Sequence, residues 1–364
     1  MIEQVIISNY KSIRDLVLQL QRVNILIGAN GVGKSNLISF FELAKAIIEQ
    51  RFGSYTLNKG GIDNLLYRSR KESEYIKGLL NFDNRNAFFF ELRPTQSSKG
   101  YIEESGDYFN NRLYEDKDYT KWNRTTWDYA VEESCLLNNP LWRAGYIRKH
   151  FKSFTVYHFH DTSSNSPMRG TWDIDDNEFL RDNGANLAAY LYRLQQTDDK
   201  AFKLIEGVVR SIAPYFKQFK LKPNSINPNK ISLEWEEKDT DMYLNGYSFS
   251  DGTLRFIALA TLLLQTNAPK VIIIDEPELG LHPAAISKFA EMVKKASFGS
   301  QIILSTQSTN LVNCFEPEDI ITVDRKDGQS VFNRLRKDDL SVWLDEYEYS
   351  LSDVWEKNII GGQL

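Results

Sequence analysis

The order of apolar and polar positions in the first fifty residues predicts three strands and a helix. Residues 1–8 (MIEQVIIS) and 15–20 (DLVLQL) alternate, which is typical of a strand with one buried face. Residues 23–27 (VNILI) form a continuous apolar run, which indicates a strand buried on both faces. Residues 35–50 place apolar side chains at helical spacing and contain no glycine or proline. The chain therefore begins as an α/β fold.

The rest of the chain contains further predicted elements and one stretch of different composition. Residues 101–154 are rich in asparagine, tyrosine, tryptophan and charge, which indicates an insertion or a second lobe. The sequence has no internal repeats and no sustained heptads. The other predicted elements are a hairpin over 75–92, an amphipathic helix over 200–218, a basic connector over 217–230, a strand over 231–235, an apolar helix over 256–264 and an apolar strand over 271–275.

A glycine-rich segment, GANGVGKS at 28–35, joins the strand at 23–27 to the helix that follows. Backbone N–H groups of such a loop point inward at an anion, and the positive end of the next helix faces the same anion. Lys34 would then reach the β- and γ-phosphates, and Ser35 would give a hydroxyl to Mg²⁺. A chance match in a glycine-rich turn is the alternative, but the flanking strand and helix favour a phosphate site. The predicted nucleotide-binding residues of this Walker A loop are Gly28, Asn30, Gly31, Val32, Gly33, Lys34, Ser35 and Asn36.

Two carboxylates follow the apolar strand at 271–275. Ligands bind at the carboxyl ends of buried parallel strands, so Asp275 is expected to meet the Mg²⁺ held by Ser35, through water. Glu276 is expected to polarise an attacking water molecule. The alternative is an acidic strand end that only caps the next turn, and the Walker A loop upstream favours the catalytic interpretation.

A third candidate site is the segment YSFSDGTLR at 247–255, which enters the apolar helix at 256–264. Its Ser250-Asp-Gly-Thr253 turn, called the signature turn below, exposes backbone N–H groups and a hydroxyl, as anion sites do. Taken alone, the turn would be interpreted as a helix N-cap. Its position between the Walker A loop and the Asp-Glu strand favours a nucleotide site.

Composition limits the class of protein. The chain has 364 residues, 42% of them hydrophobic and 26% charged, as in a globular protein with a large core. No apolar stretch approaches a membrane span, and the N-terminus has no basic leader, so we expect a cytoplasmic protein without a membrane partner. Cys135 and Cys314 fit no metal spacing and are expected to be reduced thiols. The net charge of −5 argues against a protein that coats nucleic acid over its whole surface, but it allows a local basic face.

The order of the motifs resembles that of ABC-type ATPase heads. The Walker A loop, the signature turn, the Asp-Glu strand and a later strand end at 302–308 (IILSTQS) follow one another as in these heads. In particular, the chain is similar to the RecF, SMC and OLD-like branch, in a compact RecF-like form. The segments that carry this resemblance are SNYKSIRD at 8–15, HFHDTS at 158–163, NLAAYL at 186–191, EPELGLHP at 276–283 and WEKNIIGG at 355–362. It covers nearly the whole chain and is weakest over 107–150.

The resemblance implies an ABC-ATPase head. Such a head has a mixed or parallel P-loop sheet flanked by helices, an N-terminal antiparallel β-subdomain and a helical or insertion lobe. We therefore divide the chain into an N-terminal half of the head with the Walker A loop (1–104), an insertion or helical lobe (105–230) and a C-terminal half with the signature, Walker B and switch segments (231–364).

The resemblance also implies a homodimer with ATP sandwiched between the two heads. Ser250 and Gly252 of one subunit would then bind the nucleotide held by the other subunit. ATP binding would close the dimer and hydrolysis would release it. Glu276 matches the general base of the family, and Lys11 is expected to reach the nucleotide from the N-terminal strand. The implied cofactors are ATP and Mg²⁺, with Ser35 and Asp275 as metal ligands.

The sequence departs from the ABC pattern at two places. Gln307 occupies the position where many heads carry a switch histidine, and an amide cannot carry a proton at neutral pH, so we expect slow hydrolysis. His282 stands where transporters have an aspartate, as in the RecF-like branch. Gln96 is a candidate for the family's glutamine loop.

Three other groups of residues have two interpretations each. His158, His160 and Asp161 have either a structural role, which is favoured, or a metal-binding one. The four lysines of the connector form either a solvated face or a basic patch: Lys217, Lys220, Lys222 and Lys230. A third group either binds nucleic acid or is explained without it, as the core and rim of a lobe or as a partner-protein surface: Trp122, Trp127, Tyr129, Trp142 and Tyr146 with Lys121, Arg124, Arg143, Arg148, Lys149 and Lys152.

Three functions from different classes follow. The first is an ATP-driven switch in DNA repair or antiphage defence, which would sense DNA or RNA and control a separate effector such as a Toprim or other nuclease. No coiled coil separates the head halves, and the segment after Gln307 has no Glu plus Asp-x-Asp set, so any nuclease would be another protein. The second is an ATP-locked scaffold that restrains a toxic partner with little turnover. The third is a transporter subunit, which the signature turn and the 276–283 loop disfavour.

Overall fold

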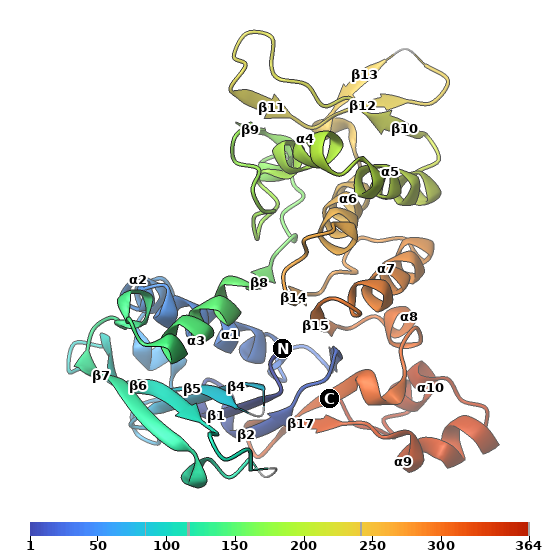
Figure 1. Ribbon diagram of the computed structural model, residues 1–364. Coiled ribbons are helices and arrows are strands. Elements are labelled where there is room, and N and C mark those ends of the chain that lie inside the picture. The colour runs from blue at the N-terminus through green and yellow to red at the C-terminus, as the bar shows by residue number, and fades with distance from the viewer. Residues whose placement is uncertain (84, 115–116, 241, 363–364) are drawn as a thin grey trace. The chain divides into compact units, whose positions relative to one another are not determined.

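The computed structural model describes residues 1–83, 85–114, 117–240 and 242–362. Two compact units make up the chain (Figure 1). One consists of Met1–Thr155 with Glu316–Leu364, and the other of Val156–Phe315. We call them unit 1 and unit 2.

An antiparallel sheet forms most of unit 1, with strand order β2-β1-β4-β5-β6-β7. Its strands confirm the predicted N-terminal strands and the hairpin, of which residue 84 lies outside the described residues. Residues 101–131, which the sequence analysis assigned to an insertion or second lobe, contribute β6 and β7 to the same sheet. The strands are β1 Gln4–Tyr10, β2 Ile13–Gln19, β4 Ile76–Asp83, β5 Asn86–Pro94, β6 Gly100–Phe109 and β7 Asn123–Val131.

Aromatic side chains pack three helices of unit 1 onto this sheet. The helices are α1 (Lys34–Ile48), α2 (Phe52–Asn58) and α3 (Trp142–Lys152). The ring of Phe40 on α1 stacks on Phe90 of β5 with centroids 5.7 Å apart, and Phe151 on α3 meets Phe88 of β5 at 5.8 Å. Each such phenylalanine contributes roughly 1.5–3 kcal/mol through burial. This core fixes α1, whose N-terminus follows the Walker A loop.

The remaining strands of unit 1 come from both ends of the chain. Strand β3 (Val23–Ile27) pairs in parallel with β16 (Ile320–Lys326), which pairs antiparallel with β17 (Gln329–Arg334). Every residue of β3 is buried, as its apolar run predicts. The other short elements are η1 Ile62–Leu65, η2 Tyr119–Lys121, η3 Leu136–Asn138, η6 Pro317–Asp319, α9 Lys337–Ser341, η7 Val342–Glu346 and α10 Leu351–Glu356.

Unit 2 is built around the helix α6 (Asp251–Leu264), in which every residue from Thr253 onward is buried. Strands β14 (Val271–Asp275) and β15 (Gln301–Thr306) are parallel, with Asp275 opposite Ser305. Two small antiparallel sheets complete the unit, in the orders β9-β11 and β10-β12-β13. The further elements are β8 Phe154–Tyr157 at the junction of the units, β9 Thr171–Asp173, β10 Phe216–Phe219, β11 Lys230–Ser232, β12 Glu234–Glu237, β13 Tyr243–Asn245, α4 Leu187–Thr197, α5 Asp199–Ile212, α7 Pro283–Ala296, α8 Thr309–Val312, η4 Pro167–Arg169 and η5 Gly246–Ser248.

Three predicted boundaries differ from the structure. The helix expected to reach residue 218 ends at Ile212, because Pro214 disfavours helical backbone at the residue before it. The strand predicted over 231–235 is divided between β11 and β12, which belong to different sheets. The chain divides into its two compact units at residues 155 and 315, whereas the predicted domain boundaries are residues 104 and 230; residue 104 lies within β6, which pairs with β5.

The aromatic and basic residues of 101–154 mostly make contacts inside unit 1. Trp122 is 4% exposed and packs on Phe89, and Tyr146 donates to Asp83 at 2.5 Å. Arg143 pairs with Asp107 at 3.0 Å, and Arg124 pairs with Glu104. These contacts support the interpretation of a lobe core with a solvated rim. Tyr129 and Trp142 are the two aromatic side chains of that group that are more than half exposed.

The contacts of the connector lysines fit a solvated face, and the two cysteines fit the expected thiols. Lys217 and Lys220 both pair with Glu236, and Lys230 pairs with Asp173. Cys135 and Cys314 are free thiols. Within the described residues, no helix has the length and apolar character that a bilayer crossing requires.

Candidate functional site

The Walker A loop lies in unit 1 between β3 and α1, and two of its glycines leave no room for a side chain. Gly28 has φ +156° and Gly33 has φ +121°. A Cβ atom on Gly28 would lie 2.5 Å from the carbonyl oxygen of Val323, and one on Gly33 would lie 2.0 Å from Ser330 Oγ. Only glycine therefore fits where the loop passes β16 and β17.

The polar groups of the loop are arranged for an anion. Lys34 is 5% exposed, and its Nζ donates to the carbonyl oxygens of Gly28 at 2.5 Å and Ala29 at 3.0 Å. Asn30, Gly31 and Ser35 are exposed. The ammonium group thus lies over the loop, where phosphate oxygens are expected to bind.

Two serines that the sequence analysis missed support the loop, Ser12 from the turn between β1 and β2 and Ser330 from β17. Ser330 Oγ donates to the carbonyl oxygen of Val32 at 2.5 Å, and Ser12 Oγ lies 2.6 Å from Ser330 Oγ. Asn36 Nδ2 donates to Ser12 Oγ at 2.6 Å. Ser12 belongs to the SNYKSIRD segment, which was the only sequence signal for this support.

Lys11 lies beside α1. Its Nζ donates to Ser39 Oγ at 2.8 Å, and burial lowers the pKa of its ammonium group to about 8. Its contact with a nucleotide stays a prediction.

In unit 2, the strand ends after β14 and β15 bring Asp275, Glu276 and Gln307 together. Ser305 Oγ donates to Asp275 Oδ1, and the backbone N–H of Glu276 donates to the carbonyl oxygen of Ser305 at 3.0 Å. Gln307 Nε2 donates to Glu276 Oε1. Glu276 has φ +40°, a rare conformation for a side chain of this size, which costs of order 1–3 kcal/mol and is typical of functional sites.

Glu278 holds the switch residue and was not predicted. Its Oε1 accepts hydrogen bonds from the Thr306 hydroxyl at 2.5 Å and from the Gln307 backbone N–H at 3.0 Å. The side chain is 8% exposed, and burial raises the pKa of its carboxyl group. Glu278 thus fixes the backbone from which the Gln307 side chain reaches Glu276. The only sequence signal was its place in the Glu-Pro-Glu segment.

The signature turn begins α6. Ser250 Oγ accepts a hydrogen bond from the Thr253 backbone N–H at 3.2 Å and is exposed. A Cβ atom on Gly252 would lie 2.3 Å from the carbonyl oxygen of Gly280, so the turn packs directly on the loop that follows Glu278. In that loop, His282 caps α7, with its Nδ1 accepting from the Ala284 N–H at 3.3 Å.

The sequence comparison with protein-family models identifies the chain. Residues 23–313 match the family described as "AAA domain, putative AbiEii toxin, Type IV TA system". The chain belongs to this AAA family. It is an ABC-type P-loop ATPase of the RecF and SMC-like branch, as the motifs predict. No curated protein matches the sequence.

Solved structures of Smc head domains have the same fold. A crystal structure of an Smc head bound to the C-terminal winged-helix domain of ScpA aligns with a TM-score of 0.61 and 17% identity, over 93% of this chain and 98% of that one. The Pyrococcus furiosus Smc head with an extended coiled coil, bound to the C-terminal domain of ScpA, gives 0.58 and 15%, over 96% and 99%. The Pyrococcus yayanosii Smc head gives 0.53 and 14%, over 96% and 99%. This member of the AAA family therefore has the fold of an ATPase head.

The remaining sequence candidates are the group of His158, His160 and Asp161 in unit 2 and Gln96 in unit 1. Among the described residues, no group of three or more histidine, cysteine, aspartate or glutamate side chains is arranged to hold a metal ion. The roles of His158, His160 and Asp161 stay predictions. Burial lowers the pKa of His160, although Asp275 and Glu276 act in the opposite direction. Gln96 is exposed in the turn after β5 of unit 1.

Replacing Gly252 with alanine is expected to weaken ATP-dependent dimerisation at least about tenfold, because a Cβ 2.3 Å from a backbone oxygen must displace the signature turn. The affinity of the monomer for ATP should stay within about twofold of wild type. Sedimentation with and without ATP measures the first quantity, and fluorescent-nucleotide titration measures the second. Gly207→Ala on α5 is the matched control, because a Cβ there meets no atom within 4 Å. Equal behaviour of the two variants would contradict the prediction.

Proposed function

We propose that the protein is an ATP-hydrolysing, homodimeric switch. The glycine cradle, the ammonium group of Lys34 and the exposed Ser35 hydroxyl fit a Mg²⁺-bound triphosphate. The observation that carries the proposal is the Glu276–Gln307 pair, a carboxylate in a strained backbone conformation with an amide hydrogen-bonded to it. Groups arranged in this way are suited to hold a water molecule for attack on a phosphate.

Each residue has a defined role in the proposed mechanism. The loop N–H groups and Lys34 would bind the β- and γ-phosphates, and Ser35 and Asp275 would hold Mg²⁺, which would supply positive charge to the phosphate oxygens. Glu276 accepts a proton from the attacking water, and the Gln307 amide orients that water. The signature turn of the second subunit, through Ser250 and Gly252, closes the site, so that hydrolysis is coupled to opening of the dimer.

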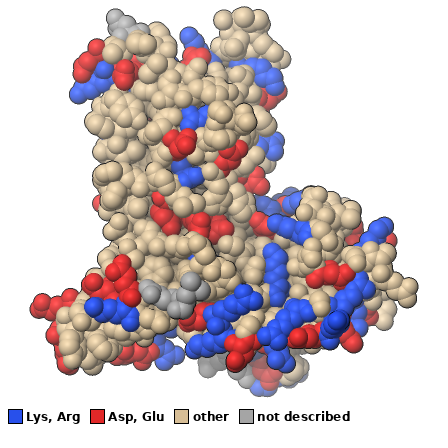
Figure 2. Space-filling model, turned by 180° about the vertical axis from the view of Figure 1, so that it is seen from behind, with Lys and Arg blue, Asp and Glu red and all other residues tan. Residues whose placement is uncertain are grey.

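We further propose that the switch senses DNA or RNA in repair or antiphage defence and controls a separate effector in the cytoplasm. The resemblance to RecF-like proteins supports this role. On the face in Figure 2, lysines and arginines lie among aspartates and glutamates, and the net charge is −5. A nucleic acid would therefore be contacted through a limited surface, with a modest dependence on salt.

A second candidate is an ATP-locked scaffold that restrains a toxic partner. Gln307 favours it, because an amide at the switch position cannot move a proton, and its hydrogen bond already occupies Glu276. The family description, which names a toxin and a type IV toxin–antitoxin system, also supports a protein partner.

The deciding experiment is ATP turnover by the purified protein, alone and with single- or double-stranded DNA or RNA. Turnover that rises with one nucleic acid, and that is absent from Glu276→Gln, would support the switch and identify its ligand. Tight ATP binding without turnover under every condition would rule out the hydrolysing switch and favour the scaffold.

A further inference from the structure

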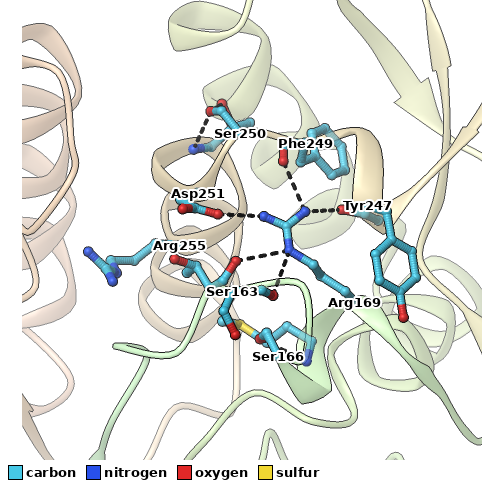
Figure 3. Close-up of polar contacts among 12 residues, drawn as sticks. Ser163, Ser166, Arg169, Tyr247, Phe249, Ser250, Asp251 and Arg255 are labelled. Atoms are coloured by element: carbon cyan, nitrogen blue, oxygen red, sulfur yellow. Dashed lines mark hydrogen bonds and ion pairs between the residues drawn. The ribbon is translucent and has the colours of Figure 1, made fainter.

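Arg169 is a buried arginine whose guanidinium group binds residues on both sides of Ser250, the first residue of the signature turn (Figure 3). Its side chain is 6% exposed. Nη1 donates to the carbonyl oxygens of Gly246 at 2.7 Å and Phe249 at 2.9 Å, which precede Ser250. Nη2 pairs at 2.7 Å with Oδ1 of Asp251, which follows Ser250. The guanidinium thus spans the residue that would contact the nucleotide.

The same guanidinium is anchored to a second segment of unit 2. Nε donates to the carbonyl oxygens of Thr162 at 3.0 Å and Ser163 at 3.1 Å, at the end of the HFHDTS segment. A buried cation costs much free energy unless it is paired and hydrogen-bonded, and these contacts meet that need. Only arginine has donors in a rigid planar fork that can engage acceptors on two segments at once.

A second arginine ties the same segment to the signature helix. Arg255 on α6 is 7% exposed. Its Nε donates to the carbonyl oxygen of Phe159 at 2.9 Å, and its Nη2 donates to that of His160 at 2.8 Å. The HFHDTS segment is therefore held against the first turns of α6 by one arginine at each of its ends.

The signature turn has room to relax if Arg169 is removed. A cavity of about 400 Å³ adjoins the turn and is lined by Ser164, Arg169, Tyr247, Phe249, Ser250 and Asp251. The Phe249 ring is fixed by stacking on Trp235, with centroids 4.6 Å apart, and the Thr253 hydroxyl is fixed by Tyr215 at 3.0 Å. Between these two anchors, Arg169 is the side chain that holds the backbone before Ser250 and the carboxylate after it.

We infer that Arg169 is a positioning residue of the signature turn, which sets Ser250 and the first N–H groups of α6 for the nucleotide bound to the other subunit. The inference rests on the proposed function. Without Arg169, the carbonyl groups of Gly246 and Phe249 lose their charged donor, and the turn shifts toward the cavity. The subunit would keep its own ATP site and fail to complete the site of its partner.

Subunit mixing tests this role directly. Arg169→Ala should bind ATP within about twofold of wild type and lose at least about tenfold in turnover. Lys34→Ala should bind ATP at least about a hundredfold more weakly, as argued in the Discussion, but should keep its signature turn. A one-to-one mixture of these two inactive variants should recover about a quarter of the wild-type turnover, because half of the dimers are mixed and each mixed dimer has one intact site.

The controls separate positioning from a loss of folding. Arg181→Ala removes an exposed arginine of the same unit, which pairs with Asp176, and should behave as wild type. Arg169→Lys keeps a charge for Asp251 but not the fork, and it should recover turnover only in part. An Arg169→Ala variant that fails to recover in the mixture, or that loses ATP affinity as a monomer, would overturn the inference.

Failure of the proposed function would give different experimental results. If the wild type dimerises with ATP without turnover, the hydrolysing switch fails, and loss of that dimer in Arg169→Ala still supports the inference. If the wild type shows neither turnover nor an ATP-dependent dimer, both proposals fail.

Discussion

Glu276→Gln should lower ATP turnover by about 10²- to 10⁴-fold, the usual effect of removing a general base. The glutamine side chain has nearly the same shape and can still accept the hydrogen bond that Gln307 Nε2 donates to Oε1. It cannot take a proton from water. The strained backbone at residue 276 should persist, because the N–H bond to the Ser305 carbonyl is unchanged. We therefore expect ATP affinity to be retained and the closed dimer to accumulate.

Phosphate release under saturating ATP measures this effect, and sedimentation measures the dimer. The matched control is Glu291→Gln, which removes an exposed carboxylate of the same unit that pairs with Lys288. Turnover within threefold of wild type in Glu276→Gln would show that another group takes the proton.

Lys34→Ala should weaken ATP binding by at least about a hundredfold, corresponding to roughly 2.7 kcal/mol. The Lys34 ammonium group lies within 3.0 Å of two loop carbonyl oxygens and is 5% exposed, so it is already desolvated and oriented before a phosphate arrives. With alanine at position 34, only backbone N–H groups would remain to stabilise the negative charge of the phosphates. The glycines at 28 and 33 keep the loop shape, so this loss should come from charge and not from folding.

Fluorescent-nucleotide titration in the presence of Mg²⁺ measures the change, with thermal unfolding as the test of folding. Lys77→Ala in β4 is the control, because it removes an exposed lysine of the same unit that pairs with Glu91. Equal ATP affinity in Lys34→Ala and Lys77→Ala would show that the Walker A loop does not bind ATP as proposed.

Much of the candidate site could be predicted from the sequence, because its motifs depend on the conformation of short stretches of backbone. Positive φ angles at Gly28 and Gly33 require glycine, and the strand before them must be apolar to be buried. The same holds for the N-cap at Ser250, whose hydroxyl binds an N–H three residues away. Motifs of this kind consist of residues that are close together in the sequence, so they can be recognised without the structure.

The residues that the sequence analysis missed act across long intervals of chain. Ser330 supports a loop some three hundred residues earlier, and Arg169 holds a turn about eighty residues later. Nothing in the neighbourhood of either residue predicts its partner, because a hydrogen-bond donor is compatible with many acceptors until the fold places one beside it. The pairing of β6 with β5 was not predicted for a similar reason, since strand pairing depends on register and not on composition.

The sequence by itself therefore determined the family to which the chain belongs and the positions of the glycine loop, the acidic strand end and the Ser-Asp-Gly-Thr turn, since each depends on local backbone geometry and a short motif. Only the tertiary structure decided which side chains hold these parts in place. Ser12 and Ser330 at the Walker A loop, Glu278 at Gln307 and Arg169 at Ser250 are all long-range contacts. Their partners are chosen by how strands and helices pack, which no short stretch of sequence specifies.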